Sequence, residues 1–314
     1  MIMRINKACL ASFLTLAAAA HTLAGANGSA PVEQRAITVP SEFSLIAGEY
    51  RITVQEKPAW TLRSLSYRQK PVLIDNGWMQ PVLNVQENGK SDFIGTGHGR
   101  EVVSSLELVS DERPVTLHPN RSEYHAAPGA TMRLTKRSVI GPYAHRSVLE
   151  LTPMGLNQYY EFEVVGDTSN VNWLYAFMLI FPNTADHYRV MRADGAATTG
   201  TLPGSPKIQY SLHQDKVTEV SMYDSANGLV STFVLAAAYA TRNGKGAFFA
   251  DRPKDNKFYL QLMPPLKRGE KASYRAAISA AEATKQTFMG VADHLSKLLQ
   301  GSQGTPQGMN RQDR

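Results

Sequence analysis

The sequence has one cysteine among 314 residues, and that residue, Cys9, stands close to the N-terminus. It lies in a segment that we expect to be removed, so the mature chain should hold neither a thiol nor a disulfide. Zinc sites built on thiolates are therefore excluded, and the eight histidines show no spacing that gathers them around a metal. We expect no metal, no cofactor and a fold that depends on an ordinary hydrophobic core.

Long hydrophobic runs are absent after the N-terminal segment. Arg4 and Lys7 precede an apolar stretch at 8–20, and Ala24-Gly25-Ala26 matches a small-x-small cleavage pattern. This arrangement is typical of a signal peptide, residues 1–26, and the apolar stretch is too short for a membrane anchor. We therefore expect no membrane span and a periplasmic or secreted protein.

A strong charge of one sign is the third absence. The formal net charge of +6 falls to +4 without Arg4 and Lys7, which is too weak to indicate a nucleic-acid partner. The span 113–149 is locally basic, because six lysines and arginines stand there against one acid, Glu123. If the fold gathers these side chains, they form a positive field suited to an acidic ligand; otherwise they are solvated strand residues.

Helical periodicity is missing before about residue 280, whereas alternation of period two is frequent. Apolar residues alternate with polar ones at 50–54, 160–164 and 258–262, as half-buried antiparallel strands require. Asn-Gly and Asp-Asn-Gly turn signals separate such runs, and Asn243-Gly244 predicts a hairpin. The sequence therefore predicts an all-β chain whose main domain is a large antiparallel β-sandwich over 43–280.

The segments on either side of the predicted β-sandwich differ from it in pattern, and so does one apolar run within it. Residues 27–42 are polar and indicate a flexible leader, and the polar tail 301–314 is expected to be disordered. Apolar residues at three- and four-residue steps over 281–300 predict one amphipathic C-terminal helix, which docks on its own sheet or on a partner. The run 171–181 predicts a central strand covered on both faces, with Trp173 in the core.

Reactive side chains are densest at 92–109, where glycines occupy positions 95, 97 and 99. Glycines permit backbone angles that side chains forbid, and they allow a ligand to approach the backbone closely. His98 and Glu101 are candidates for an acid/base pair, and Arg100 is a candidate for binding a carboxylate. The alternative is a bulge or tight hairpin, with His98 exposed and the other two side chains paired on the surface.

Other candidates combine imidazole, guanidinium and hydroxyl groups at scattered positions. His187 follows the most apolar run and is a candidate acid or base; the alternative is a loop histidine bonded to Asp186. Tyr124 is a further candidate for proton transfer. The remaining candidates are substrate-binding residues, namely Arg121, His125, His145 and Arg146 for an anionic group and Trp78 for stacking on a sugar ring.

The apolar strand and histidine loop at 170–188, the Asp194-Gly195 turn and the late block 258–274 resemble the galactose-mutarotase-type β-supersandwich. That fold is shared by aldose epimerases and by domains of several polysaccharide lyases, so the resemblance implies a carbohydrate ligand. Aldose epimerases carry an asparagine-histidine pair where this chain reads Asp186-His187, which leaves the role of His187 open.

These observations predict an exported β-sandwich protein that binds or acts on an acidic, uronate-containing glycan. Two alternatives stay open. One is an enzyme of the epimerase or lyase type, and the other is a non-enzymatic envelope scaffold or interaction protein. The prediction requires His98, Arg100, His187 and the basic span 113–149 to converge on one concave face.

Overall fold

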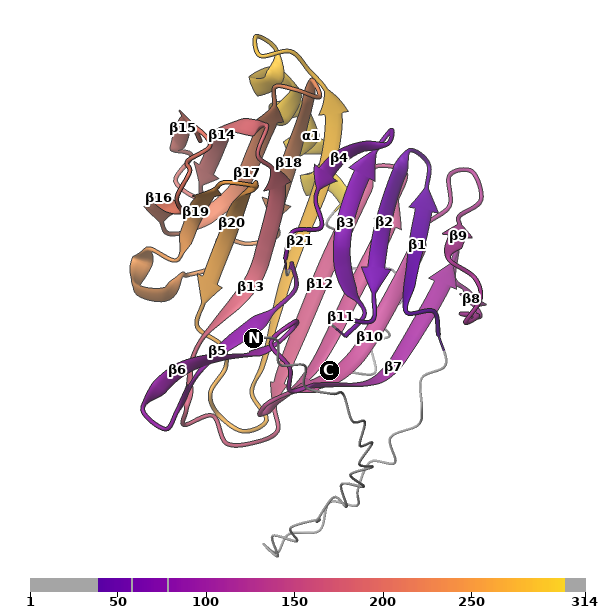
Figure 1. Ribbon diagram of the computed structural model, residues 1–314, viewed down its shortest axis with the longest axis vertical. Coiled ribbons are helices and arrows are strands. Elements are labelled where there is room, and N and C mark those ends of the chain that lie inside the picture. Colours follow the sequence, from indigo (N-terminus) through magenta and orange to yellow (C-terminus); the bar gives the residue numbers. More distant parts are fainter. Residues whose placement is uncertain (1–38, 58, 78, 303–314) are drawn as a thin grey trace, which may run out of the picture. The chain divides into compact units, whose positions relative to one another are not determined.

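The computed structural model describes residues 39–57, 59–77 and 79–302 (Figure 1). The predicted signal peptide, most of the predicted leader, Trp78 and the tail after residue 302 lie outside the described residues. The described part holds 21 strands, one short 3-10 helix and one α-helix, so the predicted all-β class with a C-terminal helix is confirmed.

The strands form three sheets, which we name A, B and C. In spatial order, sheet A holds β4 (Lys70–Leu73), β3 (Thr61–Tyr67), β2 (Tyr50–Gln55), β1 (Glu42–Ala47) and β9 (Glu123–His125). Sheet B holds β16 (Gln209–Gln214), β19 (Ala247–Arg252), β20 (Asp255–Leu262), β13 (Val171–Pro182), β5 (Val82–Glu87) and β6 (Lys90–Gly95). Sheet C holds β15 (Ala197–Thr201), β14 (Ala185–Arg192), β17 (Val217–Asp224), β18 (Leu229–Leu235), β21 (Lys271–Glu282), β12 (Gly155–Val164), β11 (Tyr143–Thr152), β10 (Met132–Ile140), β7 (Glu101–Ser110) and β8 (Arg113–Val115).

Sheets A and B lie against the same face of sheet C, so the fold is a two-layer sandwich (Figure 1). The ring of Phe177 in sheet B lies 5.2 Å from that of Tyr160 and 5.4 Å from that of Phe233, both in sheet C. Tyr50 of sheet A donates a hydrogen bond of 2.8 Å to the carbonyl of Ala280 in sheet C. Neighbouring strands are antiparallel except β1 and β9.

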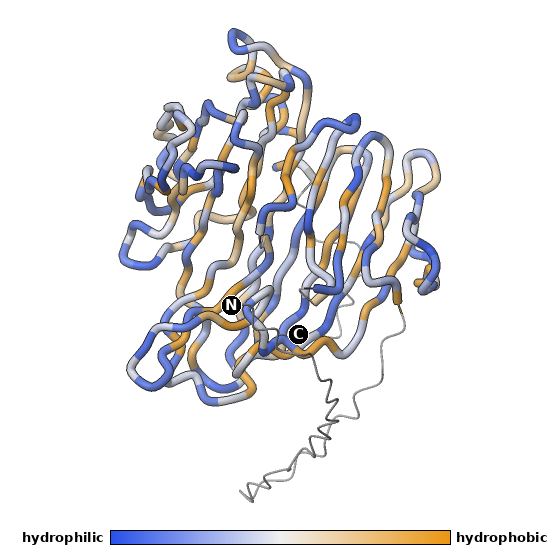
Figure 2. The backbone as a smooth tube through the Cα atoms, in the orientation of Figure 1, coloured by the Kyte–Doolittle hydropathy of each residue, from blue (hydrophilic) through white to orange (hydrophobic). Residues whose placement is uncertain are grey.

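Alternation of side chains builds the core between the layers. In β11 the odd-numbered residues from Tyr143 to Leu151 are buried, and the residues between them are half-buried. Figure 2 shows the same change between hydrophobic and hydrophilic residues along many of the strands. In β20, Phe258, Leu260 and Leu262 are fully buried, which leaves Lys257, Tyr259 and Gln261 on the opposite face of sheet B.

The α-helix, α1 (Phe288–Ser302), begins seven residues later than predicted. The residues up to Glu282 continue β21 instead, because they still pair with β18, where Glu282 lies opposite Leu229. Ala292 and Leu295 of α1 share a buried cluster with Val230 of β18. No helix among the described residues is long and apolar enough to cross a membrane.

Two local predictions were wrong. Asn243 has the predicted positive φ, at 54°, but it lies in the 3-10 helix η1 (Arg242–Gly244), and the flanking strands β18 and β19 belong to different sheets. β13 is central in sheet B as predicted, yet Trp173 is only half-buried. The guanidinium of Arg242 lies 3.9 Å from the centre of the Trp173 ring, which therefore forms a surface stack and not part of the core.

Candidate functional site

The glycine-spaced stretch forms a crossing between two sheets and not a hairpin within one. β6 of sheet B ends at Gly95, and β7 of sheet C begins at Glu101. Gly95, Gly97 and Gly99 have φ of 103°, 76° and 77°, and Arg100 has φ of 61°. A Cβ on Gly95 would lie 3.1 Å from the Pro81 carbonyl oxygen, so a side chain would not fit there without movement. The predicted unusual backbone is confirmed. Within the crossing, the Gly95 amide donates to the Gly99 carbonyl at 2.9 Å, so residues 95–99 form a tight turn with His98 exposed, as the alternative interpretation expects.

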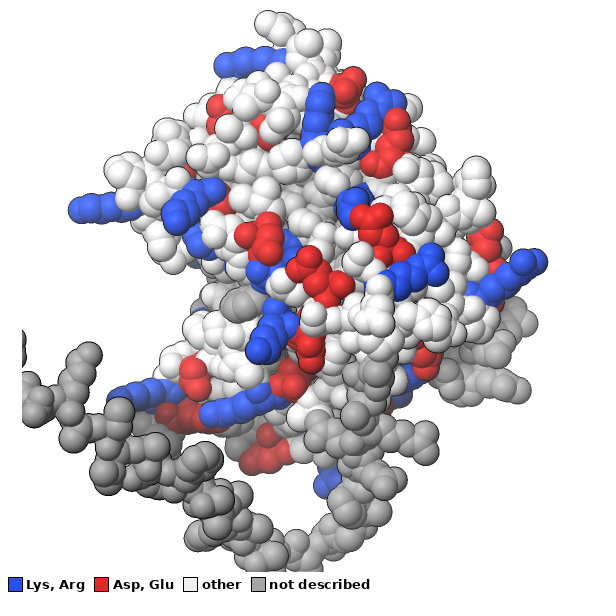
Figure 3. Space-filling model, turned by 45° about the vertical axis from the view of Figure 1, so that its right-hand side comes forward, with Lys and Arg blue, Asp and Glu red and all other residues white. Residues whose placement is uncertain are grey.

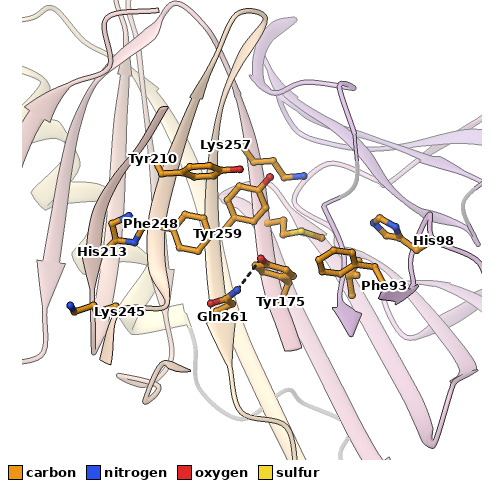
Figure 4. Close-up of a pocket in the computed structure, with 12 residues that line it drawn as sticks. Phe93, His98, Tyr175, Tyr210, His213, Lys245, Phe248, Lys257, Tyr259 and Gln261 are labelled. Carbon is orange, nitrogen blue, oxygen red and sulfur yellow. Dashed lines mark hydrogen bonds between the residues drawn. The ribbon is translucent and has the colours of Figure 1, made fainter. Parts of the chain in front are cut away.

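The two reactive residues of this stretch go to different places. His98 lies at the rim of a cavity on sheet B, with its ring 5.4 Å from that of Phe93 (Figure 4). Glu101 points into the sandwich, where its side chain is 2% exposed. Among the described residues no contact joins His98 to Glu101, so the predicted acid/base pair is not formed.

Glu101 belongs to what we name the buried polar cluster, together with Lys136, Ser138 and His145. Lys136 Nζ lies 2.7 Å from Glu101 Oε1, and the Ser138 hydroxyl donates to the same oxygen at 2.8 Å. His145 Nδ1 lies 3.0 Å from Ser138 Oγ, and because the serine proton goes to Glu101, the imidazole is the donor. Thr96 of the glycine-spaced turn donates to the other Glu101 oxygen at 3.3 Å.

Burial and pairing set the charges of this cluster. Burial raises the pKa of Glu101, but the positive charge of Lys136 and the neighbouring His145 outweigh it and lower the pKa to about 2. Burial lowers the pKa of His145, which is therefore neutral near pH 7. The centre of the His145 ring lies 4.8 Å from that of Phe162, with 33° between the ring planes, and its Nε2 has no hydrogen-bond partner among the described residues. His145 is closed off from ligands, contrary to its predicted binding role.

The candidates around β9 do not form a concave site. Tyr124 is 1% exposed, and its hydroxyl accepts a hydrogen bond of 2.8 Å from the His118 amide. Arg121 lies over the Tyr124 ring and donates to the Glu123 carbonyl. His125 is exposed beside the Glu123 carboxylate, at 3.4 Å. Tyr124 is thus a core residue, and the other two candidates are surface residues with partners.

Arg100, Arg146 and His187 also lie apart from one another. Arg100 forms a two-pronged pair with Glu87 on the surface. Arg146 alternates with the buried residues of β11, so it lies on the outer face of sheet C. On the face seen in Figure 3, lysines and arginines stand beside aspartates and glutamates, not in one basic patch. Lys136 and His145 of the span 113–149 point into the sandwich, whereas Arg146 lies on the outer face of sheet C, so the span does not gather into one positive field.

His187 lies on β14 and not in the predicted exit loop. Its Nδ1 is 2.7 Å from Asp186 Oδ1, which is the arrangement of the alternative interpretation. The centre of the His187 ring lies 6.5 Å from the centre of the Phe288 ring at the start of α1. His98 is the only one of the sequence candidates among the described residues that lines the cavity.

The cavity lies on the face of sheet B that points away from sheet C, and its volume is about 510 Å³. That size is within the range of small-molecule binding sites. Among the described residues, its lining includes two lysines and two histidines but no aspartate or glutamate. The described lining residues are Val82, Phe93, His98, Tyr175, Met178, Tyr210, His213, Lys245, Phe248, Lys257, Tyr259 and Gln261.

Two β-bulges direct side chains into this cavity. β13 has one extra residue between Tyr175 and Phe177, so Tyr175 lies opposite Gln261, and Met178 lies opposite Tyr259. Both therefore share the cavity face, which strict alternation would forbid for residues three apart. In β16 the register shifts between Ser211 and Gln214, and His213 is brought against Phe248.

Aromatic rings form a continuous wall along the cavity (Figure 4). The rings of Phe248 and Tyr259 stack at 5.0 Å with 16° between their planes, and the His213 ring stacks on Phe248 at 5.5 Å. Tyr259 contacts Tyr175 at 5.4 Å, and Tyr175 contacts Phe93 at 6.1 Å. The wall ends at His98, whose ring contacts that of Phe93 at a tilt of 41°. Because each ring is held by its neighbours, the wall is preformed.

Polar groups are few and fixed. Gln261 Nε2 donates to the Tyr175 hydroxyl at 2.9 Å. Lys257 is 5% exposed; burial and the neighbouring Arg252 lower its pKa to about 8, and Asp255 only partly opposes them. Partial burial against Phe93 and the charge of Lys257 lower the pKa of His98, which is therefore neutral near pH 7.

Sequence reasoning missed most of this site, although part of its signal was present. The alternation at 258–262 already placed Tyr259 and Gln261 on the face opposite the apolar residues. The alternation alone does not show whether that face is covered by solvent or lines a cavity. Tyr175, Met178 and His213 could not be assigned, since the bulges that orient them leave no period in the sequence.

Among the described residues, no group of three or more histidine, cysteine, aspartate or glutamate side chains is arranged to hold a metal ion. No family model and no curated protein matches the sequence.

Several solved structures are similar in arrangement. A GH36 α-galactosidase from Geobacillus stearothermophilus is 10% identical with a TM-score of 0.48, over 77% of this chain and 41% of its own. A putative aldose 1-epimerase from Escherichia coli K12 is 10% identical with a TM-score of 0.44, over 77% of this chain and 99% of its own. A galactose mutarotase-like protein from Clostridium acetobutylicum is 9% identical with a TM-score of 0.45, over 76% of this chain and 94% of its own.

The resemblance to the mutarotase-type fold that the sequence predicted is therefore found again among solved structures. The chain spans about two fifths of the length of the α-galactosidase. At such identities and TM-scores the likeness concerns the arrangement of strands, and no activity or ligand follows from it.

Proposed function

We propose that the protein is exported and that it binds an acidic, uronate-containing carbohydrate in the cavity of sheet B. The single observation that carries the binding proposal is the lining of this cavity. A preformed aromatic wall lies beside two lysines and two histidines, and no acidic residue in the part of the chain that the structure describes lines the cavity. Export rests on the N-terminal sequence and would appear as a mature chain that begins at Asn27.

The aromatic wall suits a sugar ring. The CH groups on one face of a pyranose carry a small positive charge, and the face of an aromatic ring carries a negative one, so the two attract when stacked. Phe248 and Tyr259 are nearly parallel, at 16°, and offer a broad flat surface for this contact. The Tyr175 hydroxyl, the Gln261 amide and the exposed Tyr210 can exchange hydrogen bonds with sugar hydroxyls.

The charge of the lining favours a carboxylate over a neutral sugar. Lys245 and His213 lie together at one end of the cavity (Figure 4), and both are exposed, so a carboxylate there keeps part of its hydration. Lys257 adds positive charge near the middle while it is protonated. An acid in the lining would cancel this field, and none is present.

The test is calorimetric titration with a panel of short oligouronates and matched neutral oligosaccharides. We expect oligouronates to bind more tightly than neutral sugars, and Lys245→Ala to reduce that preference about tenfold. Arg146→Ala is the matched control, because it removes a cation from the outer face of sheet C. Equal affinity for acidic and neutral sugars, or no binding of either, would defeat the proposal.

Proton transfer from a bound uronate is the second candidate function. The observation that favours it is His98, which lines the cavity and is neutral near pH 7, as a base must be. Elimination produces an unsaturated sugar that absorbs in the ultraviolet, whereas epimerisation changes only optical rotation. If the protein binds oligouronates and neither signal appears, it is a binding protein and not a lyase or an epimerase.

A further inference from the structure

Lys257 differs from the other basic groups of the cavity. It lies on β20 between Ala250 of β19 and Ile180 of β13, and only 5% of it is exposed. Its side chain lines the cavity, with Nζ 5.0 Å from the centre of the Tyr259 ring (Figure 4). Among the described residues no hydrogen bond or ion pair is made by this nitrogen. A buried amine with access to a cavity and without a partner is available for chemistry.

The groups that face Lys257 favour the neutral amine. Arg252 carries a positive charge nearby, and it pairs with Asp255 at 3.3 Å, so the aspartate is shared and not reserved for the lysine. Asn76 donates a further hydrogen bond to Asp255. His98, on the other side of the cavity lining, provides no negative charge that would stabilise an ammonium. A desolvated lysine beside a second cation is a recognised way to obtain a nucleophilic amine.

We propose that Lys257 condenses with an aldehyde group of the ligand and forms an imine. The inference rests on the proposed function in one respect, which is that the aldehyde belongs to the open-chain form of a reducing sugar. The cavity would then hold a sugar by a covalent, reversible bond at Lys257 as well as by stacking on the aromatic wall.

The reaction balances without any redox partner. The lone pair of the neutral amine attacks the carbonyl carbon, and the carbonyl oxygen takes up a proton, which gives a carbinolamine. Loss of water then forms the C=N bond, so one amine and one aldehyde give one imine and one water. The protonated imine carries the same single positive charge as the ammonium that Asp255 already faces, so the product needs no new counter-charge.

The chain provides two matched control lysines. Lys245 lines the same cavity but is exposed, so its labelling gives the rate for a lysine that the aldehyde can reach and that is still hydrated. Lys136 is 2% exposed, and its Nζ forms an ion pair with Glu101 and donates a hydrogen bond to the Ala59 carbonyl. Its labelling therefore gives the rate for a buried lysine that the aldehyde cannot reach.

The experiment uses the mature chain, glycolaldehyde as the probe and sodium cyanoborohydride to trap the imine at pH 7, followed by peptide mass spectrometry. We expect Lys257 to be labelled at least about tenfold faster than Lys245, because each unit of lowered pKa gives about tenfold more neutral amine. Lys136 should remain unlabelled. Lys257→Arg should lose the fast label, keep the positive charge and keep the thermal midpoint within a few degrees.

Equal labelling of Lys257 and Lys245, or no labelling of Lys257 in the folded chain, would overturn the proposal. Glycolaldehyde has no sugar ring, so this result is independent of the binding test. Fast labelling that oligouronates do not slow would leave the amine established and defeat the proposed function. Oligouronate binding without fast labelling would support the proposed function and overturn the proposal of a reactive amine at Lys257. A non-reducing oligouronate that protects Lys257 supports both.

Discussion

The buried polar cluster and the cavity contain the same kinds of side chains, yet they differ in where their polar atoms find partners. In the cluster, Glu101 accepts bonds from Lys136 and Ser138, and Lys136 also donates to the Ala59 carbonyl. In the cavity, Lys257 Nζ makes no hydrogen bond to any described residue. A lysine or histidine is therefore a candidate for ligand binding only when a ligand can reach it and when its nitrogen has no hydrogen-bond partner within the protein.

The two regions also stabilise the fold in different ways. The cluster ties β7, β10 and β11 together through charges inside the sandwich, where a lost partner is costly. The cavity wall is held by ring contacts on the outer face of sheet B, where removal of one ring exposes the others to solvent. Substitutions should therefore change stability in the first region and ligand binding in the second.

The largest effect should come from Lys136→Met, which leaves the Glu101 carboxylate buried without its cation. We expect the free energy of unfolding to fall by about 3–5 kcal/mol, the usual cost of breaking a buried ion pair from one side. Denaturant titration followed by circular dichroism measures it. The double variant Lys136→Met/Glu101→Gln removes both charges and should recover most of the loss. A single variant as stable as the wild type would show that the cluster is not closed to water.

The pH dependence of stability should be the next effect. The pKa of His145 in the folded chain is below its ordinary value of 6.5, so the unfolded chain binds a proton first as the pH falls. Stability is therefore lost below about pH 6.5, with a slope of at most about 1.4 kcal/mol per pH unit for one proton. Glu101 affects stability at lower pH. Its contribution to the stability of the fold is fully present above pH 4.5 and is lost as the pH falls towards about 2.

Thermal unfolding of wild type and His145→Gln between pH 5 and 7 separates these groups. The variant should lose the part of the slope that His145 contributes, and Glu101 adds none because it is ionised throughout this window in the folded chain. A slope that persists in the variant would assign the remainder to another histidine, and His98, whose pKa burial also lowers, is then the residue to replace.

This comparison also shows what the sequence could supply. The alternation at 258–262 and the apolar run 171–181 were enough for the all-β class, because burial of one face imposes period two. The positive φ of Gly95, Gly97 and Gly99 followed from residue type alone. His98 and Glu101 are three residues apart, and which of them faces a cavity depends on a crossing between sheets that local spacing does not encode.

The cavity could not be predicted for the same physical reason. Its walls come from all six strands of sheet B, and the order of these strands is set by long-range packing. Tyr175 and His213 owe their orientation to bulges, and a bulge changes the face of every residue beyond it. The basic span 113–149 misled because β10 and β11 alternate, which sends His145 inward and Arg146 outward.

On the cavity side, Tyr259→Ala should reduce oligouronate affinity about tenfold, which corresponds to about 1.4 kcal/mol. The ring is the centre of the wall, between Phe248 and Tyr175, so its loss removes the stacking surface and loosens both neighbours. The thermal midpoint should change little, because Tyr259 lies outside the sandwich core. Calorimetry gives the affinity, and Tyr159→Ala on the outer face of sheet C is the matched control. An equal loss of affinity in both variants would point to a general change in the fold.

The smallest effect should come from Arg100→Asn, although the sequence marks Arg100 as a residue for holding an anionic group. Its guanidinium is about half exposed and pairs with Glu87, and exposed pairs contribute about 0–1 kcal/mol. Asparagine tolerates the positive φ of this position, so backbone strain does not confuse the result. We expect oligouronate affinity within about twofold of wild type. A tenfold loss would extend the site from His98 along the turn to Arg100, because in that case the guanidinium must leave Glu87 when the ligand binds.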